Sequence, residues 1–475
     1  MRLQNIENFI VKFRSNIKYI QIFMFVGFLC LTIMPLYSTT PLFNDTIFTS
    51  SILLSQFLFW GVWYGLCLFS VIPFGRLWCG VLCPLGAVSQ WAGKLGPGLK
   101  MPKWMRWDGW LLIMFFGVTI LGQTLDVRDD PIGLSKLFLY IFILAIIIGL
   151  LFGKKGSRPW CRYFCPIGKI LGIVSRLGAI DFRPHKIRMN GGLSKPLYIE
   201  GRLCPTDYNL PYKVSSNNCI ACGACIHGKK KSGLGLYTRK IGTENFNITK
   251  HDASWSEVLF ILFSPGLCAG GFLWLILHQY QVFHDQLGTW FLERNDLWFF
   301  HTASSWISSQ TWNQHFNWLD ILTIILYMLS YSIIVGLALS ALMAISSLLL
   351  RSKIHDFKKV FISLVYQFNP VAILSIVIGL CGKFFEVMHH DFSMSNKIAS
   401  AIKLLLLLAS MLWTLQLSWK KINSITKKST PKACMSFISI LICTCLILYM
   451  WWPAIFNLSY MSVVEQIRKH IIVPG

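Results

Sequence analysis

Cysteine is the residue type whose spacing in this chain suits inorganic chemistry. One group consists of Cys204, followed by Pro205, and then Cys219, Cys222 and Cys225 at steps of three residues. Three cysteines at this spacing with a remote Cys-Pro are a ligand pattern of [4Fe–4S] clusters, which need four thiolates converging from different directions. The pattern therefore predicts one such cluster, held by Cys204, Cys219, Cys222 and Cys225.

Two other sites fit the same cysteines less well. A structural Zn²⁺ site usually pairs its cysteines two and two, whereas three here are equally spaced. A disulfide does not persist in a reducing cytosol. Two-cluster ferredoxins carry a further cysteine four residues after the third, and this chain has Lys229 there. We therefore expect one cluster in this segment.

A second cysteine pattern occurs twice. Trp78-Cys79-Gly-Val-Leu-Cys83-Pro84 follows one apolar run, and Trp160-Cys161-Arg-Tyr-Phe-Cys165-Pro166 follows another. In a helix, cysteines four residues apart point the same way. Two such pairs would offer four thiolates to a second iron–sulfur cluster or to soft ions such as Cu(I). The alternatives are redox-active thiols without metal and cysteines that only pack.

Composition places these motifs in a membrane protein. Of 475 residues, 54% are hydrophobic and 13% charged, and mean hydropathy is +0.55. In a soluble protein the net charge of +24 would suggest nucleic-acid binding. Here we expect no nucleic-acid partner, because the excess of Lys and Arg in loops on one side of a bilayer accounts for the charge.

The hydropathy pattern predicts an all-α integral membrane protein with a small inserted ferredoxin-like cytoplasmic segment. We expect about nine transmembrane helices, at about 19–37, 51–73, 110–123, 134–152, 258–278, 319–350, 360–380, 398–417 and 434–452. Three domains follow. Residues 1–153 form a four-helix membrane domain with the first motif. Residues 154–250 carry the second motif and the ferredoxin-like site, and residues 251–475 form a five-helix membrane domain without an assigned role.

Loop charges predict the orientation. Loops 76–106 and 420–432 each contain five Lys or Arg and no acid, whereas segment 124–136 contains three aspartates. Cationic short loops stay inside. We therefore expect a multi-pass protein of a bacterial-type inner (plasma) membrane, with the N-terminus and the cluster segment in the cytoplasm.

Together these motifs, over about residues 50–240, resemble a family of membrane-bound polyferredoxin-like proteins. The family includes the quinol-dehydrogenase membrane subunit of periplasmic nitrate reductase, the nitrous-oxide-reductase regulator and the copper-assembly ferredoxin of cytochrome oxidase. The resemblance implies [4Fe–4S] electron transfer in an inner membrane, often with quinol as donor. Lys229 departs from the family pattern, and residues 251–475 carry no resemblance that we identify.

The sequence therefore predicts a membrane-bound iron–sulfur electron-transfer protein, with quinol or a cytoplasmic donor on one side and a respiratory or maturation partner on the other. It is a candidate quinol-linked oxidoreductase subunit, with no catalytic side chain assigned. The alternatives are a copper assembly or transport protein that uses the paired motifs, and a cluster-based redox sensor.

Partners follow from the remaining charged and titratable groups. Besides the lipid bilayer and a candidate quinone, we expect an acidic redox partner to dock on basic residues around the cluster (Arg202, Lys213, Lys229, Lys230, Lys231 and Arg239). A haem b between His278 and His389 or His390 is the less favoured interpretation of the histidines, because no two spans carry them mid-membrane at facing depth.

Overall fold

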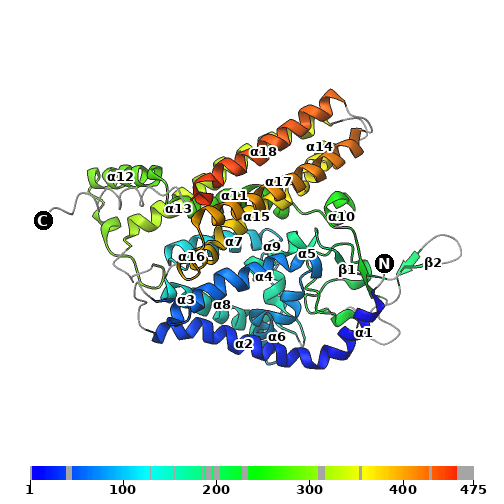
Figure 1. Cartoon of the computed structure of the whole chain (residues 1–475). Helices are drawn as coiled ribbons and strands as arrows, with labels where there is room; N and C mark the ends of the chain where they lie inside the picture. Colours follow the sequence, from blue (N-terminus) through cyan, green and yellow to red (C-terminus); the bar gives the residue numbers. More distant parts are fainter. Residues whose placement is uncertain are drawn as a thin grey trace. The chain divides into compact units, whose positions relative to one another are not determined.

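The structure is a computed structural model, and it is mostly helical (Figure 1). It describes residues 3–38, 45–128, 130–154, 156–184, 186–188, 194–196, 204–226, 234–308, 316–351, 356–426 and 430–456. The helices are α1 (Gln4–Phe13), α2 (Ile17–Ile33), α3 (Ser51–Gln56), α4 (Tyr64–Phe69), α5 (Val71–Phe74), α6 (Pro84–Ala92), α7 (Trp110–Thr124), α8 (Pro131–Phe152), α9 (Pro166–Ser175), α10 (Thr243–Phe246), α11 (Trp255–Leu273), α12 (His278–Glu293), α13 (Trp318–Leu349), α14 (Phe357–Gln367), α15 (Asn369–Leu380), α16 (Gly382–His390), α17 (Asn396–Thr426) and α18 (Pro431–Ile455). The strands are β1 (Ile180–Pro184), β2 (Lys186–Arg188), β3 (Ser194–Pro196) and β4 (Leu234–Thr238).

Several helices are long and apolar enough to cross a membrane. Within the described ranges there are seven, or eight if the bent pair α14 and α15 counts as one span. The pair bends by 40° next to Pro370, which lies in the first turn of α15. The ninth expected span is α7, which has only 15 residues and is shorter than the roughly 20 that a bilayer requires.

The chain divides into two compact units. One consists of residues 1–34, 65–115 and 138–257, and the other of residues 35–64, 116–137 and 258–475. These units do not follow the three consecutive domains expected from the sequence, and that division stays a prediction. All eight motif cysteines lie in the first unit.

Aromatic side chains hold the helices of the first unit together. Phe25 of α2 packs edge-on against Trp91 of α6, with 5.8 Å between ring centroids. Phe28 of the same helix packs against Phe142 of α8 at 5.5 Å. Edge-to-face rings at such separations add to the free energy that burial supplies. These contacts fix α6, which follows directly from the first Cys-x-x-x-Cys-Pro motif.

A small two-stranded sheet supports the ferredoxin-like segment. Strands β1 and β4 pair antiparallel, with Phe182 opposite Leu236. Both side chains are buried, and they form a core with Leu210 and Cys225. This apolar contact anchors the cysteine loop to secondary structure on either side of it in the chain. Strands β2 and β3 form a separate antiparallel pair.

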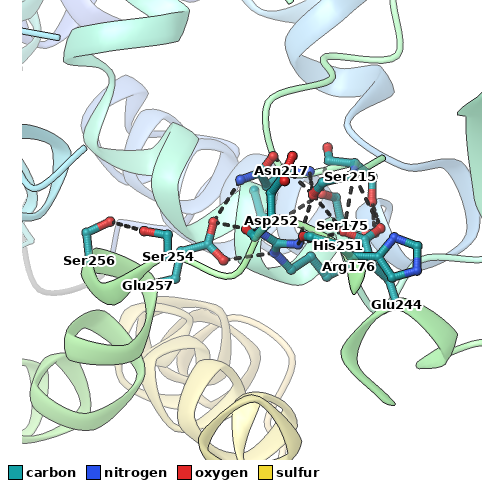
Figure 2. A network of polar contacts seen from close by, with 12 residues as sticks. Ser175, Arg176, Ser215, Asn217, Glu244, His251, Asp252, Ser254, Ser256 and Glu257 are labelled. Carbon is teal, nitrogen blue, oxygen red and sulfur yellow. Dashed lines mark hydrogen bonds and ion pairs between the residues drawn. The ribbon is translucent and has the colours of Figure 1, made fainter. Parts of the chain in front are cut away.

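A buried ionic network fixes this segment to the end of α9 (Figure 2). Arg176 is fully buried, and its guanidinium donates to Glu244 at 2.8 Å, to Glu257 at 2.8 Å and to Ser215 at 2.8 Å. Arg239 donates to the second oxygen of Glu244 at 2.5 Å. Because every charge in the network has a hydrogen-bonded opposite charge, its burial is tolerated. The network sets the position of residues 215–217, which lead into Cys219.

Unit 2 is a bundle in which α13 packs on α18, and α17 packs on both α15 and α18 (Figure 1). Its longest helix, α13, begins at a capping box. The Asn317 side chain accepts from the Asp320 N–H at 2.8 Å, and the Asp320 side chain accepts from the Asn317 N–H at 2.8 Å. This reciprocal pair satisfies two donors at the start of the helix.

We predict that Glu244→Gln lowers the free energy of unfolding by about 3–5 kcal/mol at pH 7, because Arg176 and Arg239 would face a neutral amide without compensating charge. Burial raises the pKa of Glu244, but Arg176 and Arg239 outweigh it, so that the pKa lies below its usual value. The stabilisation is therefore complete above the unfolded pKa of about 4.3 and is lost as the pH falls through the lower folded value.

Urea unfolding in detergent, followed by tryptophan fluorescence between pH 3 and 7, measures this difference. The matched control is Glu293→Gln, at an exposed carboxylate on α12. Equal midpoints for Glu244→Gln and wild type at pH 7 would contradict the prediction.

Candidate metal centre

The four cysteines of the ferredoxin-like segment meet at one pocket. Cys204, Cys219, Cys222 and Cys225 all line a cavity of about 370 Å³, counted to its open mouth. Most of the other lining residues are apolar, and Lys213 is the one charged residue among them. All fifteen cysteines lie in the described ranges, and all are free thiols. The disulfide alternative is therefore not what the structure shows.

The backbone of the cysteine loop directs N–H groups at the sulfurs. Ala221 and Gly223 have φ angles of +50° and +66°, which turn the chain tightly around the pocket. Burial raises the pKa of Cys222 to about 11, and the Ala224 N–H, which donates to its sulfur, offsets part of that rise. Burial likewise raises the pKa of Cys219, against the Ala221 N–H and the charge of Lys213. N–H donors to cysteine sulfur are one of the means by which proteins tune iron–sulfur clusters.

Lys213 is an internal charge of this site. Burial lowers its pKa, but Asp181 more than compensates, so that the pKa is raised and the ammonium stays charged. Its Nζ donates to Asp181 Oδ1 at 2.8 Å, and the residue is only 5% exposed. Arg239 is similarly engaged with Glu244. The expectation that Lys213 and Arg239 dock a partner is therefore wrong. Arg202, Lys229, Lys230 and Lys231 lie outside the described residues.

The two Cys-x-x-x-Cys-Pro motifs have the same backbone. Each begins with a π-helical turn, at Trp78–Leu82 and Trp160–Phe164. The N–H of Cys83 bonds to the carbonyl of Trp78 at 2.8 Å, and that of Cys165 to Trp160 at 2.9 Å. Cys83 and Cys165 are extended, with ψ angles of 117° and 111°. The cysteine pairs therefore do not lie on an α-helix as expected, because a residue before proline avoids the α conformation.

Each Cys-x-x-x-Cys-Pro motif contacts the other through its glycine and its arginine. A Cβ on Gly86 would lie 3.0 Å from the sulfur of Cys161, and a Cβ on Gly168 would lie 3.2 Å from Arg76 Nη2. Arg158 of the second motif likewise reaches the first motif, where its Nη1 donates to the carbonyl of Cys79 at 2.8 Å. The structure thus brings the two motifs, and with them Cys79, Cys83, Cys161 and Cys165, into one buried region.

The charges of this region favour an anionic sulfur-ligated group. Arg76 and Arg158 are each 3% exposed. In the described part of the chain neither forms an ion pair with a carboxylate, and Arg76 Nε and Trp160 Nε1 have no hydrogen-bond partner. Isolated buried cations are costly unless a negative charge compensates them. A [4Fe–4S] core held by four thiolates has about two net negative charges, so these residues fit such a group.

Protonation alone does not supply that negative charge. Burial raises the pKa of Cys161 to about 12, despite the lowering effect of Arg158, and the neighbouring Cys83 and Cys79 raise it further. Burial raises the pKa of Cys83 to about 11. Without a metal these thiols therefore stay neutral at pH 7. Metal ligation removes the thiol proton, which would give Arg76 and Arg158 their missing counter-charge.

No set of three or more His, Cys, Asp or Glu side chains within the described ranges is arranged around a single metal ion. A zinc or copper ion would need its ligands to converge on one atom. A cubane spreads its four ligand sulfurs over a larger body, as four cysteines distributed around a pocket do.

The two cysteine sets touch through backbone. A Cβ on Gly80 would lie 2.7 Å from Cys222 Cα and 2.8 Å from its backbone nitrogen. On the other motif, the N–H of Arg158 donates to the carbonyl of Pro205 at 2.6 Å. Arg76 Nη1 donates to the carbonyl of Asn217 at 2.5 Å. The ferredoxin-like loop is therefore seated directly on both motifs.

The N-terminal helix covers the cysteine loop, which the sequence analysis missed. Ile10 of α1 lies so close to Gly223 that a side chain there would clash with it. Arg14 donates to the Ala224 carbonyl at 3.0 Å, and Glu7 accepts from the Leu236 N–H at 2.7 Å. The available signal was the amphipathic pattern of residues 4–13, which we did not separate from the first apolar run.

The histidines proposed for haem lie in unit 2. His278 begins α12 and contacts Gln281 at 3.4 Å, and His389 of α16 contacts the Met394 carbonyl at 2.7 Å. These are local hydrogen bonds at exposed positions.

Comparison with known proteins supports the chemistry. Residues 56–102 and 136–189 match the family model described as a 4Fe-4S binding domain. These ranges contain both Cys-x-x-x-Cys-Pro motifs and end before Cys204. No solved structure matches the chain.

Relatives match about a third of the chain. An uncharacterized protein of Methanocaldococcus jannaschii is 29% identical over 179 residues, 34% of this chain and 72% of the relative. The putative electron transport protein YccM of Escherichia coli is 26% identical, over 32% of this chain and 48% of its own length. The ferredoxin-type protein NapH of the same organism is 22% identical, over 34% of this chain and 62% of its own length. The resemblance to membrane-bound polyferredoxin-like proteins is confirmed for this part of the chain.

We predict that Cys222→Ala abolishes the iron–sulfur signal of the ferredoxin-like loop, because a cubane needs all four thiolates at that pocket. Anaerobically purified protein should lose about four iron and four sulfide per chain, together with a reduced-state EPR signal. Cys30→Ala, at an exposed cysteine of α2 outside both motifs, is the matched control and should retain them. An unchanged signal in Cys222→Ala would contradict the assignment.

A second prediction concerns the seat of the loop. Gly80→Ala introduces a methyl group against the backbone of residue 222, and overpacking of this kind costs about 1–3 kcal/mol. We expect a lower unfolding midpoint and an altered EPR line shape. Gly117→Ala, where no atom lies within 4 Å of the added methyl, should change neither. If Gly80→Ala behaves like the control, the close contact is absent.

Proposed function

We propose that this chain is a membrane-bound electron-transfer protein that holds two iron–sulfur centres side by side. One is a [4Fe–4S] cluster on Cys204, Cys219, Cys222 and Cys225. The second is on Cys79, Cys83, Cys161 and Cys165. The observation that carries the proposal is the direct contact between the two cysteine sets, at Gly80 against Cys222. A bound [4Fe–4S] group would accept and release single electrons.

The protein's own residues supply binding, insulation and charge. The Ala221 and Ala224 N–H groups donate to cysteine sulfurs, which favours the anionic form of each ligand. Ile10 packs against Gly223 and covers that part of the loop. Lys213, held charged by Asp181, faces Cys219 from the apolar wall. Together these groups stabilise negative charge on the sulfur ligands.

Arg76 and Arg158 stabilise negative charge on the cysteines of the paired motifs. Both are buried between the two cysteine sets, and each also bonds to the backbone of the ferredoxin-like segment. Their positive charges lower the energy of negative charge in either set, and most of all between them. This arrangement favours electron occupancy at both centres and exchange between them.

The donor is proposed to be quinol or a cytoplasmic reductant, and the acceptor a respiratory or maturation partner. Two relatives support a role in electron transfer, because their names describe an electron transport protein and a ferredoxin-type protein. The charge pattern of the short loops supports a cytoplasmic position for the cysteine lobe in a bacterial-type inner membrane. An acidic partner would be recognised by Arg202 and Lys229–Lys231.

Burial favours this function over copper transport. Cys79 and Cys161 are 7% and 8% exposed. A protein that hands ions onward needs thiols that a partner can reach, whereas a resident cluster is best enclosed.

The test is a double variant, Cys79→Ala with Cys161→Ala. Wild-type protein purified without oxygen should contain about eight iron atoms, and the double variant about four. A menaquinol analogue should reduce both centres in wild-type protein reconstituted in vesicles, as followed by EPR. In the double variant, dithionite should still reduce the remaining cluster. If the double variant keeps all its iron, the second centre is disproved. If no quinol analogue reduces the wild type, quinol is not the donor.

A further inference from the structure

A separate group of charged side chains lies in unit 2, which contains none of the eight motif cysteines. It consists of Arg128, which follows α7, of Lys383 and Glu386 on α16, and of Lys403 on α17. Glu386 forms ion pairs with Arg128 through one oxygen and with Lys383 through the other, the second at 2.9 Å. Both oxygens of this carboxylate are thus engaged.

Lys403 is different, because no carboxylate in the described residues pairs with it directly, and Glu386, which lies within electrostatic range, is already shared by Arg128 and Lys383. The residue is 7% exposed, and it forms neither a hydrogen bond nor an ion pair with any part of the chain that the structure describes. Its Nζ lies 5.2 Å from the ring centroid of Phe385. The side chain is enclosed along its length, but its Nζ is not among the buried nitrogen atoms without a partner in the described residues, so the charged tip reaches the surface of unit 2.

The position of Lys403 makes the lack of an ion-pair partner unusual. It is the eighth residue of α17, about 10 Å along the axis from the first, and within the apolar stretch of a helix long enough to span a bilayer. Ionisable groups inside a membrane are rare, and they mark functional sites unless they are paired. Glu386 is the nearest acid. Burial raises its pKa, but Arg128 and Lys383 bring that pKa down to about 2.

The remaining neighbours suit a lipid. Arg128 lies over the ring of Phe272 at 5.5 Å, and Phe384 stacks on Phe57 at 6.0 Å between centroids. The side chains of Arg128 and Glu386 are 29% and 45% exposed, so the group opens at the surface of unit 2. Arginine and lysine beside one another, bordered by aromatic rings, offer donors for a phosphate oxygen and an apolar wall for acyl chains.

We propose that Lys403, Arg128 and Lys383 bind the phosphate of an anionic phospholipid at the membrane surface of unit 2. Three cations here share the single carboxylate Glu386, and the phosphate would add negative charge beside Lys403, Arg128 and, on α16, Lys383. The loop charges of this chain would otherwise disfavour cations here, because segment 124–136 is on the side expected to be cation-poor. The proposal is independent of the iron–sulfur centres.

Phosphate analysis of purified protein, after exhaustive detergent exchange, tests the site. Wild type should retain phospholipid, and Lys403→Met should retain about fivefold less, as expected for one lost charge contact near a membrane surface. Lys403→Arg should retain it. Lys397→Met, at an exposed lysine six residues earlier on the same helix, is the matched control and should behave as wild type. Equal retention in Lys403→Met and Lys397→Met would overturn the proposal.

The source of the phosphate is tested separately, by thermal unfolding of delipidated protein. Phosphatidylglycerol should raise the midpoint of wild type and not that of Lys403→Met, whereas phosphatidylcholine should raise it less. If inorganic phosphate alone reproduces the full shift, a free anion is the ligand and the lipid assignment fails. Because Lys403→Met replaces a charge by an apolar chain inside a span, it should fold, and Lys403→Arg confirms that a loss reflects charge.

Discussion

The burial of one guanidinium constrains most of the cysteine lobe. Arg176, at the end of α9, is enclosed by Glu244 and Glu257 and by the backbone of residues 251 and 252. Breaking such a buried pair leaves an uncompensated charge, which is far more costly than the pair is stabilising. All of these segments must therefore be in place together. Residues 215–217 are held by the same network, and through them the start of the cysteine loop is held on the helix that follows the second motif.

The repeat of the Cys-x-x-x-Cys-Pro motif gives this lobe its chemistry. Proline forces the second cysteine of each copy into an extended conformation, and the π-helical turn before it displaces the first. Glycines at matching positions then allow the copies to approach closely, so that the arginine of each reaches the other. Arg76 and Arg158 are thereby buried, and neither pairs with a carboxylate of the described residues. Their presence is difficult to explain as packing, and it is what makes an anionic group among the cysteines the favoured interpretation.

The contrast between the two charged sites is informative. Around the cysteines, cations are enclosed near thiols that can lose their protons to a metal. In unit 2, Lys403 is enclosed near a carboxylate that other cations already occupy. The same physical rule, that a buried charge needs a partner, points to an inorganic cluster in one place and to a lipid phosphate in the other.

The sequence by itself determined the membrane class, most of the spans, the repeated motif and the eight cysteines of interest, because hydropathy and cysteine spacing are local properties. It also predicted a span at residues 110–123, where the structure has an apolar helix of only 15 residues, and the total of nine spans stays a prediction. The sequence prediction placed Lys213 and Arg239 on the surface, because sequence alone does not distinguish a solvated charged residue from one that is paired inside the protein. Only the tertiary structure decided that α1 covers the loop, that Gly80 lies against Cys222, and that Arg76 and Arg158 are buried without a carboxylate partner among the residues that the structure describes. Each of these depends on contacts between residues far apart in the chain, which no local pattern records.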